Sequence, residues 1–214
     1  MCAVKIMRCS SEEAIEEAVR VISRGGLVVY PTDTVYGLGC DPFNEEAVER
    51  VFRVKGRLSR PLPILVSSME RAERLVDLGS VGATLASNFW PGALTIVAPI
   101  KRGVPIPKNL TCGFTTLGIR VPNHSCALRL IDGAGGYLVG TSANRSGERP
   151  SLTVDEAVKS LQQSVDLYLD GGSTALGKES TVLDISGEKP KVVREGAISK
   201  ETVFGVLRSL GFPI

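Results

Sequence analysis

Short apolar runs that alternate with amphipathic segments constrain the fold of this chain more than any other feature. Residues 27–30 follow two glycines and form an uninterrupted run, Leu-Val-Val-Tyr, which is typical of a strand buried on both faces. Before this run, apolar residues recur at helical spacing over residues 15–22. Similar short runs occupy residues 64–66, 94–98, 137–140 and 167–169. Buried strands that alternate with helices predict an α/β fold.

Two of the predicted strands run directly into segments rich in hydroxyl groups. Pro31 cannot donate a hydrogen bond to a strand ladder and therefore ends the first strand; Thr-Asp-Thr follows at residues 32–34. The strand at residues 137–140 runs into Thr-Ser-Ala-Asn at residues 141–144. Ligands of α/β proteins bind beyond the carboxyl ends of strands, so the two segments predict a shared cleft. The alternative is a pair of ordinary polar turns, which favour the same residue types.

A basic segment follows the second predicted helix. Asn44 is placed to cap the start of this helix, and Gly56 is placed to end it. Lys55 falls on the apolar face of the helix, so we expect its side chain to point inward, toward the core or a cleft. Arg57 and Arg60 come directly afterwards. These cations form either a phosphate site or the favourable positive charge that is common at a helix C-terminus.

The composition limits the classes of protein to which the chain can belong. Its 214 residues suffice for one sizeable core, and its net charge of +2 is too small to predict nucleic-acid binding. No stretch is long and apolar enough to span a bilayer. The five cysteines include no CxxC pair, and His124 is the only histidine. We therefore expect reduced cysteines, no multi-histidine metal site and a cytoplasmic location.

Residues 172–178 match the spacing of a phosphate-binding P-loop as far as its lysine, Gly-Ser-Thr-Ala-Leu-Gly-Lys. Glu179 then stands where a P-loop has the serine or threonine that holds magnesium, and a strand pattern follows where a P-loop has a helix. We interpret this segment as a flexible glycine loop that covers the site, and not as a P-loop.

Cations and small polar groups come from several separate parts of the chain. The basic side chains are Lys55, Arg57, Arg60, Arg120 and Arg194, and the hydroxyl and amide groups are Thr32, Thr34, Ser142, Asn144, Ser180 and Thr181. Arginine binds phosphate and carboxylate with two parallel hydrogen bonds, and lysine supplies a movable point charge. If these groups converge, the site suits a polyanion beside a small zwitterion.

Six short motifs follow one another along the chain. They are YPTDTVYGLG at residues 30–39, VKGR at 54–57 with RPL at 60–62, LGIRVP at 117–122, TSANRSG at 141–147, ESTVLD at 179–184 and VREG at 193–196. In this order they resemble the YrdC family of L-threonylcarbamoyl-AMP synthases. The resemblance implies a twisted, mostly mixed open sheet flanked by helices, with a concave basic cleft. It also implies one YrdC-like catalytic domain over residues 1–214.

The resemblance implies a nucleotidyltransferase reaction. L-threonine, bicarbonate and ATP would give L-threonylcarbamoyl-AMP and pyrophosphate, and the product would supply the threonylcarbamoyl group of a modified tRNA adenosine. The positions that match the threonine side are Thr34, Arg120, Ser142 and Ser180. The positions that match the ATP side are Lys55, Arg57, Arg60, Thr116, Asn144, Ser151 and Arg194. Among these, Lys55 and Arg57 would act in catalysis by stabilising charge on the phosphates.

The resemblance also implies the cofactors and partners. Magnesium is expected on the ATP phosphates, with no certain ligand from the protein, and we expect no zinc, haem or nicotinamide. The expected macromolecular partners are tRNA, through a direct contact, and a downstream threonylcarbamoyl transferase complex. No association with a membrane is expected. Two other functions remain open: a non-catalytic RNA-binding module that uses the same basic cleft, and a carbamoyl-transfer module like that of the larger hydrogenase-maturation proteins.

Overall fold

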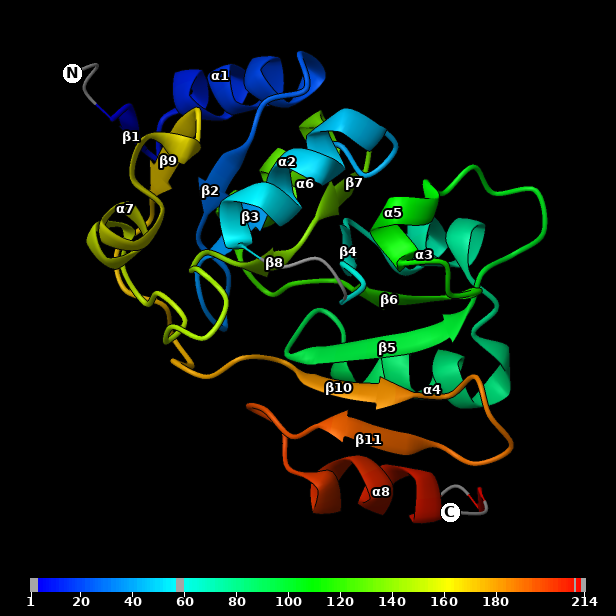
Figure 1. The fold of residues 1–214 in the computed structure, drawn as a ribbon. Helices are drawn as coiled ribbons and strands as arrows, with labels where there is room; N and C mark the ends of the chain where they lie inside the picture. Colours follow the sequence, from blue (N-terminus) through cyan, green and yellow to red (C-terminus); the bar gives the residue numbers. More distant parts are fainter. Residues whose placement is uncertain (1–3, 57–59, 210, 213–214) are drawn as a thin grey trace.

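The structure is a computed structural model that describes residues 4–56, 60–209 and 211–212 (Figure 1). Its helices are α1 (Glu12–Ser23), α2 (Glu45–Lys55), α3 (Met69–Leu75), α4 (Gly79–Phe89), α5 (Lys108–Thr111), α6 (Ser125–Gly133), α7 (Val154–Leu161), the 3-10 turn η1 (Gln162–Ser164) and α8 (Lys200–Ser209). Its strands are β1 (Ile6–Arg8), β2 (Val28–Tyr30), β3 (Gly37–Gly39), β4 (Ile64–Val66), β5 (Leu94–Pro99), β6 (Thr116–Arg120), β7 (Tyr137–Val139), β8 (Thr141–Ser142), β9 (Leu167–Asp170), β10 (Thr181–Asp184) and β11 (Lys191–Arg194).

The strands form two mixed sheets, and the predicted mixed α/β architecture is confirmed. The five-stranded sheet has the order β1-β9-β2-β3-β8, and the six-stranded sheet has the order β11-β10-β5-β6-β4-β7. Parallel pairs occur in both sheets, between β9 and its two neighbours, between β10 and β5, and between β4 and β6. The remaining pairs are antiparallel. The strands therefore divide between two sheets, where the sequence analysis expected one.

The chain crosses from the six-stranded sheet to the five-stranded sheet between β7 and β8 (Figure 1). Gly140 lies at the crossing, and its N–H donates to the Pro63 carbonyl at 2.9 Å. A Cβ atom on Gly140 would lie 2.3 Å from Cγ of Leu65, so a larger residue here would force Leu65 to shift. Residues 141–142, which the sequence analysis placed in a loop, instead form β8, because they pair with β3.

Helix α2 begins and ends where its sequence predicts. The side chain of Asn44 accepts a hydrogen bond from Ala47 N at 3.0 Å, which caps the helix N-terminus. Gly56 follows the last helical residue with φ of 63°. Lys55 is 2% exposed, which confirms that its side chain points inward.

The helices cover both sheets. Apolar side chains of α1 and α6 pack with those of β2 and β9 in one cluster, which also contains Leu65 of β4 and Leu138 of β7. Helix α7 packs on β9 and β2, and α4 packs on β5 and on α8. A larger apolar cluster contains residues of both sheets, including Leu38 of β3 and Ile96 of β5. Among the described helices, none is both long and apolar enough to cross a membrane.

A disulfide joins Cys9, which follows β1, to Cys126 in the first turn of α6. This finding corrects the expectation that the cysteines are reduced. The sequence analysis based that expectation on the wide spacing of the cysteines, but the packing of α1 on α6 brings two of them together across 117 residues. Cys40 and Cys112 are not joined by a disulfide to other described residues.

Candidate active site

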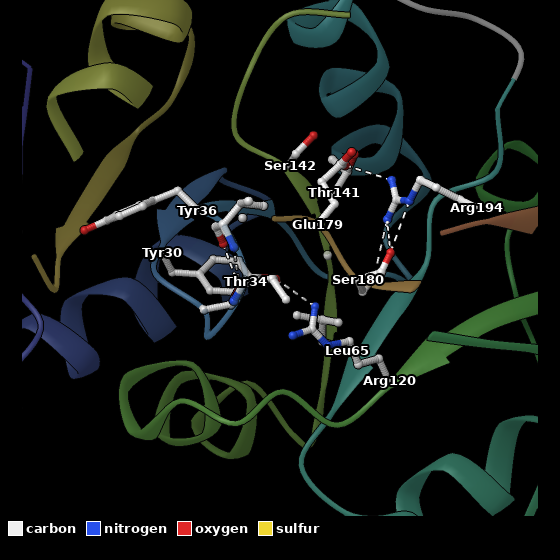
Figure 2. A pocket seen from close by; sticks show the side chains of 14 residues that line it. Tyr30, Thr34, Tyr36, Leu65, Arg120, Thr141, Ser142, Glu179, Ser180 and Arg194 are labelled. Atoms are coloured by element: carbon white, nitrogen blue, oxygen red, sulfur yellow. Dashed lines mark hydrogen bonds and ion pairs between the residues drawn. The ribbon is translucent and has the colours of Figure 1, made fainter. Parts of the chain in front are cut away.

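A pocket lies where strand ends of the two sheets meet (Figure 2). The empty space within it is about 340 Å³, a figure that includes space open to solvent. Strand β6 ends there at Arg120 and β11 ends there at Arg194, while β10 begins one residue after Ser180. The pairing of β10 with β5 and β11, and of β5 with β6, brings these ends to one edge of the six-stranded sheet. Thr34 and Ser142 reach the pocket from the five-stranded sheet and its β2–β3 connection.

Arg120 is held in the pocket wall by three acceptors. Its Nε donates to the Gly92 carbonyl at 2.7 Å, its Nη1 to Thr34 Oγ1 at 3.0 Å and its Nη2 to Asp33 Oδ1 at 2.5 Å. The Asp33 carboxylate also accepts from the backbone N of Asn123 at 3.1 Å. Burial lowers the pKa of Arg120 from its ordinary value, and the adjacent Asp33 opposes that shift. The ion pair therefore fixes a charged guanidinium at a buried position.

The second arginine of the pocket lies on the hairpin of β10 and β11. Arg194 donates through Nε and Nη2 to the Ser180 carbonyl, at 3.2 Å and 2.9 Å, and through Nη1 to Glu179 Oε1 at 2.8 Å. The Ser180 hydroxyl is 2.8 Å from Thr95 Oγ1. In Figure 2, Ser180 lies between the Arg194–Glu179 pair and Arg120. The pocket thus has a cation toward each end and hydroxyl groups between them.

Lys55 and two other predicted ATP-side residues lie behind the β8 segment and support its backbone. The Lys55 ammonium donates to the carbonyls of Ser142 at 2.5 Å and of Asn144 at 2.8 Å. Ser151 Oγ donates to the Ala143 carbonyl at 2.7 Å. The Asn144 amide donates to two carbonyls of the same loop, those of Arg145 and Glu148, both at 2.9 Å. The shape of the loop at residues 141–151 therefore depends on a buried lysine.

The structure brings together five of the residues that the family resemblance assigns to the site, which line the pocket with the predicted hydroxyl group of Thr32: Thr34, Arg120, Ser142, Ser180 and Arg194. Thr116 lies on the same strand as Arg120 but at its other end, opposite Pro99. Arg60 is exposed, and Arg57 lies outside the described residues. The predicted threonine-side group is therefore compact, and the predicted ATP-side group is spread over a wider region.

Two acidic residues of this site, Asp33 and Glu179, were not among the predicted site residues. Asp33 belongs to the motif at residues 30–39, and its burial next to Arg120 follows from a contact between the two sheets that sequence spacing does not reveal. Glu179 lines the pocket and pairs with Arg194. The second pair follows from local strand pairing, since the hairpin of β10 and β11 places Arg194 opposite Val182 and close to residues 179–180.

Two tyrosines of the pocket have their hydroxyl groups occupied. Tyr30 donates to the Val139 carbonyl at 2.9 Å, and Tyr36 donates to the Gly172 carbonyl at 2.7 Å. Burial raises the pKa of both phenols above the ordinary value. Both tyrosines are therefore neutral hydrogen-bond donors that shape the pocket.

The described part of the chain has no group of three or more histidine, cysteine, aspartate or glutamate residues that could hold a metal ion. A magnesium ion that keeps several waters and binds through substrate phosphates needs no such group.

The fold and the pocket together define an α/β protein with a site for a small ligand at strand ends. A family model named for Sua5, YciO and YrdC, with the description telomere recombination, matches residues 20–196. The chain belongs to this Sua5/YciO/YrdC family. The family resemblance predicted from the six motifs is therefore confirmed.

Curated relatives and a solved structure agree with this membership. Threonylcarbamoyl-AMP synthase of Pyrococcus abyssi (strain GE5 / Orsay) is 36% identical over 202 residues, which cover 91% of this chain and 59% of that protein. The putative threonylcarbamoyl-AMP synthase of Mycobacterium tuberculosis (strain ATCC 25618 / H37Rv) is 38% identical over 195 residues, which cover 90% and 88%. The structure of P. abyssi Sua5 complexed with L-threonine superimposes with a TM-score of 0.89 at 34% identity, over 97% of this chain and 61% of that one. The chain thus spans about three fifths of the P. abyssi protein.

Proposed function

We propose that this chain synthesises L-threonylcarbamoyl-AMP from L-threonine, bicarbonate and ATP and releases pyrophosphate. The amine of threonine would combine with bicarbonate to form a carbamate. An oxygen of the carbamate would then attack the α-phosphorus of ATP, and pyrophosphate would leave. Such a reaction depends mainly on the placement of charge and on the orientation of the reactants.

The observation that carries the proposal is the arrangement of charge in the pocket. Arg120 is buried and fixed beside Thr34, which suits the carboxylate and hydroxyl of a small amino acid. Arg194 is 42% exposed at the other end of the pocket, where it can exchange its present partners for phosphate oxygens. Ser180 and Ser142 supply polar groups between them. The P. abyssi protein whose structure holds L-threonine supports the amino-acid half of this assignment.

We assign the ATP side to Lys55, Arg57, Arg60, Thr116, Asn144, Ser151 and Arg194. Three of these, Lys55, Asn144 and Ser151, bind the loop at residues 141–151 from behind. We assign these three residues the role of shaping the loop on which the phosphates would lie. A lysine can exchange one carbonyl for a phosphate oxygen without leaving its place, since the ammonium has three donors. Lys55 and Arg57 would stabilise the charge that develops as pyrophosphate leaves.

Magnesium would accompany ATP and neutralise charge on its phosphates. We further propose that residues 1–214 act as one catalytic domain and that the reaction occurs in the cytoplasm, where tRNA is found. A downstream threonylcarbamoyl transferase complex would consume the product. A direct contact with tRNA would place the enzyme close to that complex.

Isotope-labelled bicarbonate tests the proposed product. The purified chain is incubated with ATP, magnesium, L-threonine and the labelled bicarbonate, and the products are separated and identified by mass spectrometry. We expect threonylcarbamoyl-AMP that carries the label, and none when threonine is omitted. AMP alone, or a labelled product formed without threonine, would contradict the proposal.

A further inference from the structure

Among the described residues that line the pocket, Glu179 is the only one with a carboxylate side chain. It comes from the segment before β10, and its side chain is 33% exposed. Its backbone is anchored, because the Glu179 carbonyl accepts from Ala197 N at 2.8 Å. Gly196 packs on the same segment so closely that a Cβ there would lie 2.2 Å from the Glu179 carbonyl oxygen.

Other acidic or phenolic groups near the pocket are already occupied. The Asp33 carboxylate is buried and accepts from Arg120 and from Asn123 N. Tyr30 and Tyr36 donate to backbone carbonyls, and burial disfavours their charged forms. None of these three groups is suited to bind an ammonium ion or to take its proton.

Glu179 has one side-chain partner that a ligand can replace. Arg194 Nη1 donates to Glu179 Oε1, but the same guanidinium also makes two hydrogen bonds to the Ser180 carbonyl. A phosphate oxygen that approaches Nη1 can therefore take the place of Glu179 Oε1, while Nε and Nη2 still hold the Ser180 carbonyl. Such an exchange leaves the Glu179 carboxylate available inside the pocket.

We infer that Glu179 binds the α-ammonium group of the amino-acid substrate and accepts the proton that this group loses before the carbamate forms. The inference rests on the proposed function. A zwitterion that places its carboxylate against Arg120 needs an acceptor for its ammonium, and Glu179 lies on the other side of Ser180 from Arg120 (Figure 2). An ammonium that lacked a partner here would lose its hydration without compensation.

Atoms and charges are conserved in the proposed proton transfer and carbamate formation. One proton passes from the ammonium to a Glu179 oxygen and leaves a neutral amine. The nitrogen lone pair then forms the bond to the bicarbonate carbon as a C–O bond of bicarbonate breaks. The oxygen leaves as water, with the hydrogen it carried and one amine proton, and the carbamate keeps the negative charge. Glu179 afterwards releases its proton to solvent.

A pair of ligands that differ by the amino group tests this role without relying on catalysis. L-Threonine and 3-hydroxybutanoate, which lacks the amine, are titrated by calorimetry into the wild type and into Glu179→Gln, in the presence of saturating inorganic pyrophosphate to occupy Arg194. Glutamine keeps an oxygen that can accept from Arg194 and removes only the charge. We expect Glu179→Gln to bind threonine at least about tenfold more weakly and 3-hydroxybutanoate within about twofold of wild type. Glu188→Gln, an equal charge change on the exposed turn of the same hairpin, is expected to bind both ligands as wild type does.

The binding of inorganic pyrophosphate serves as a control, because it shows whether the Glu179→Gln substitution has disturbed Arg194. Glu179→Gln is expected to bind it at least as tightly as wild type, because a negative charge beside the phosphate site has been removed. Unchanged threonine binding by the variant, or an equal loss for threonine and 3-hydroxybutanoate, would overturn the inference and leave Glu179 as the anchor of Arg194. If the wild type binds no threonine, the proposed function itself fails.

Discussion

Asp33 and Arg120 form a buried ion pair between the β2–β3 connection and the end of β6, with Nη2 and Oδ1 2.5 Å apart. Their side chains are 8% and 5% exposed. The pair therefore links a segment of the five-stranded sheet to a strand of the six-stranded sheet at the pocket. Both the stability of this junction and the charge offered to a ligand depend on it.

Replacing Asp33 should destabilise the fold. In Asp33→Asn the Arg120 guanidinium stays buried without its counter-ion, so we expect the free energy of unfolding to fall by about 3–5 kcal/mol. Urea denaturation measures this loss. Glu70→Gln breaks an exposed ion pair with Arg74 and should change the free energy of unfolding by less than about 1 kcal/mol. An equally small change for Asp33→Asn would show that the buried pair contributes little.

Lys55→Met tests how the loop at residues 141–151 depends on the buried ammonium. Methionine keeps the apolar stem but leaves the Ser142 and Asn144 carbonyls without their donor. We expect turnover to fall by about a hundredfold or more, while unfolding remains cooperative and the free energy of unfolding falls by about 1–3 kcal/mol. Lys159→Met, on the exposed face of α7, serves as the control. Turnover close to wild type would remove Lys55 from the mechanism.

Ser180→Ala should separate the two substrates. The hydroxyl contacts Thr95 Oγ1 and accepts from Arg194 Nη2 at 3.3 Å, and we place it on the threonine side. Loss of one hydrogen bond to a charged substrate corresponds to roughly a tenfold rise in KM for threonine. Steady-state kinetics with each substrate varied in turn should show a much smaller rise for ATP. Equal rises for both substrates would contradict this placement.

The pH dependence of the free energy of unfolding should reveal the protonation of His124, the single histidine of the chain. Burial lowers the pKa of His124 below its ordinary value of 6.5, and nearby Asp33 partly opposes the shift. The unfolded chain therefore binds a proton more readily than the folded chain, so the stability contribution of His124 is constant above about pH 7 and is lost as the pH falls through 6.5. We expect the wild type to lose stability relative to His124→Gln between pH 7 and pH 5. A difference that changes only above pH 7 would contradict the direction of the shift.

Local rules predicted much of the fold because the signals lie within a few residues. The cap at Asn44, the helix end at Gly56 and the inward direction of Lys55 all follow from one helix and its neighbours. The contact of Arg194 with Ser180 is also local, because β10, β11 and their turn are adjacent in the sequence.

The parts that could not be predicted depend on contacts between distant segments. Residues 141–142 carry the composition of a loop, but they become β8 because β3 offers an unpaired edge more than 100 residues earlier in the chain. The Cys9–Cys126 disulfide needs the packing of α1 on α6. Lys55 was predicted to meet phosphate, and the structure adds that its ammonium binds two backbone carbonyls, which no sequence pattern specifies.

Pyrophosphate release by the pure chain tests the central claim most directly. The chain is supplied with ATP and magnesium, and L-threonine and bicarbonate are each present or withheld. The proposed synthase activity predicts pyrophosphate only when both are present, at a rate that increases with the concentration of each. Pyrophosphate release that does not require both threonine and bicarbonate would contradict the claim that this pocket makes threonylcarbamoyl-AMP. The absence of release from a chain that binds ATP and threonine would contradict it as well.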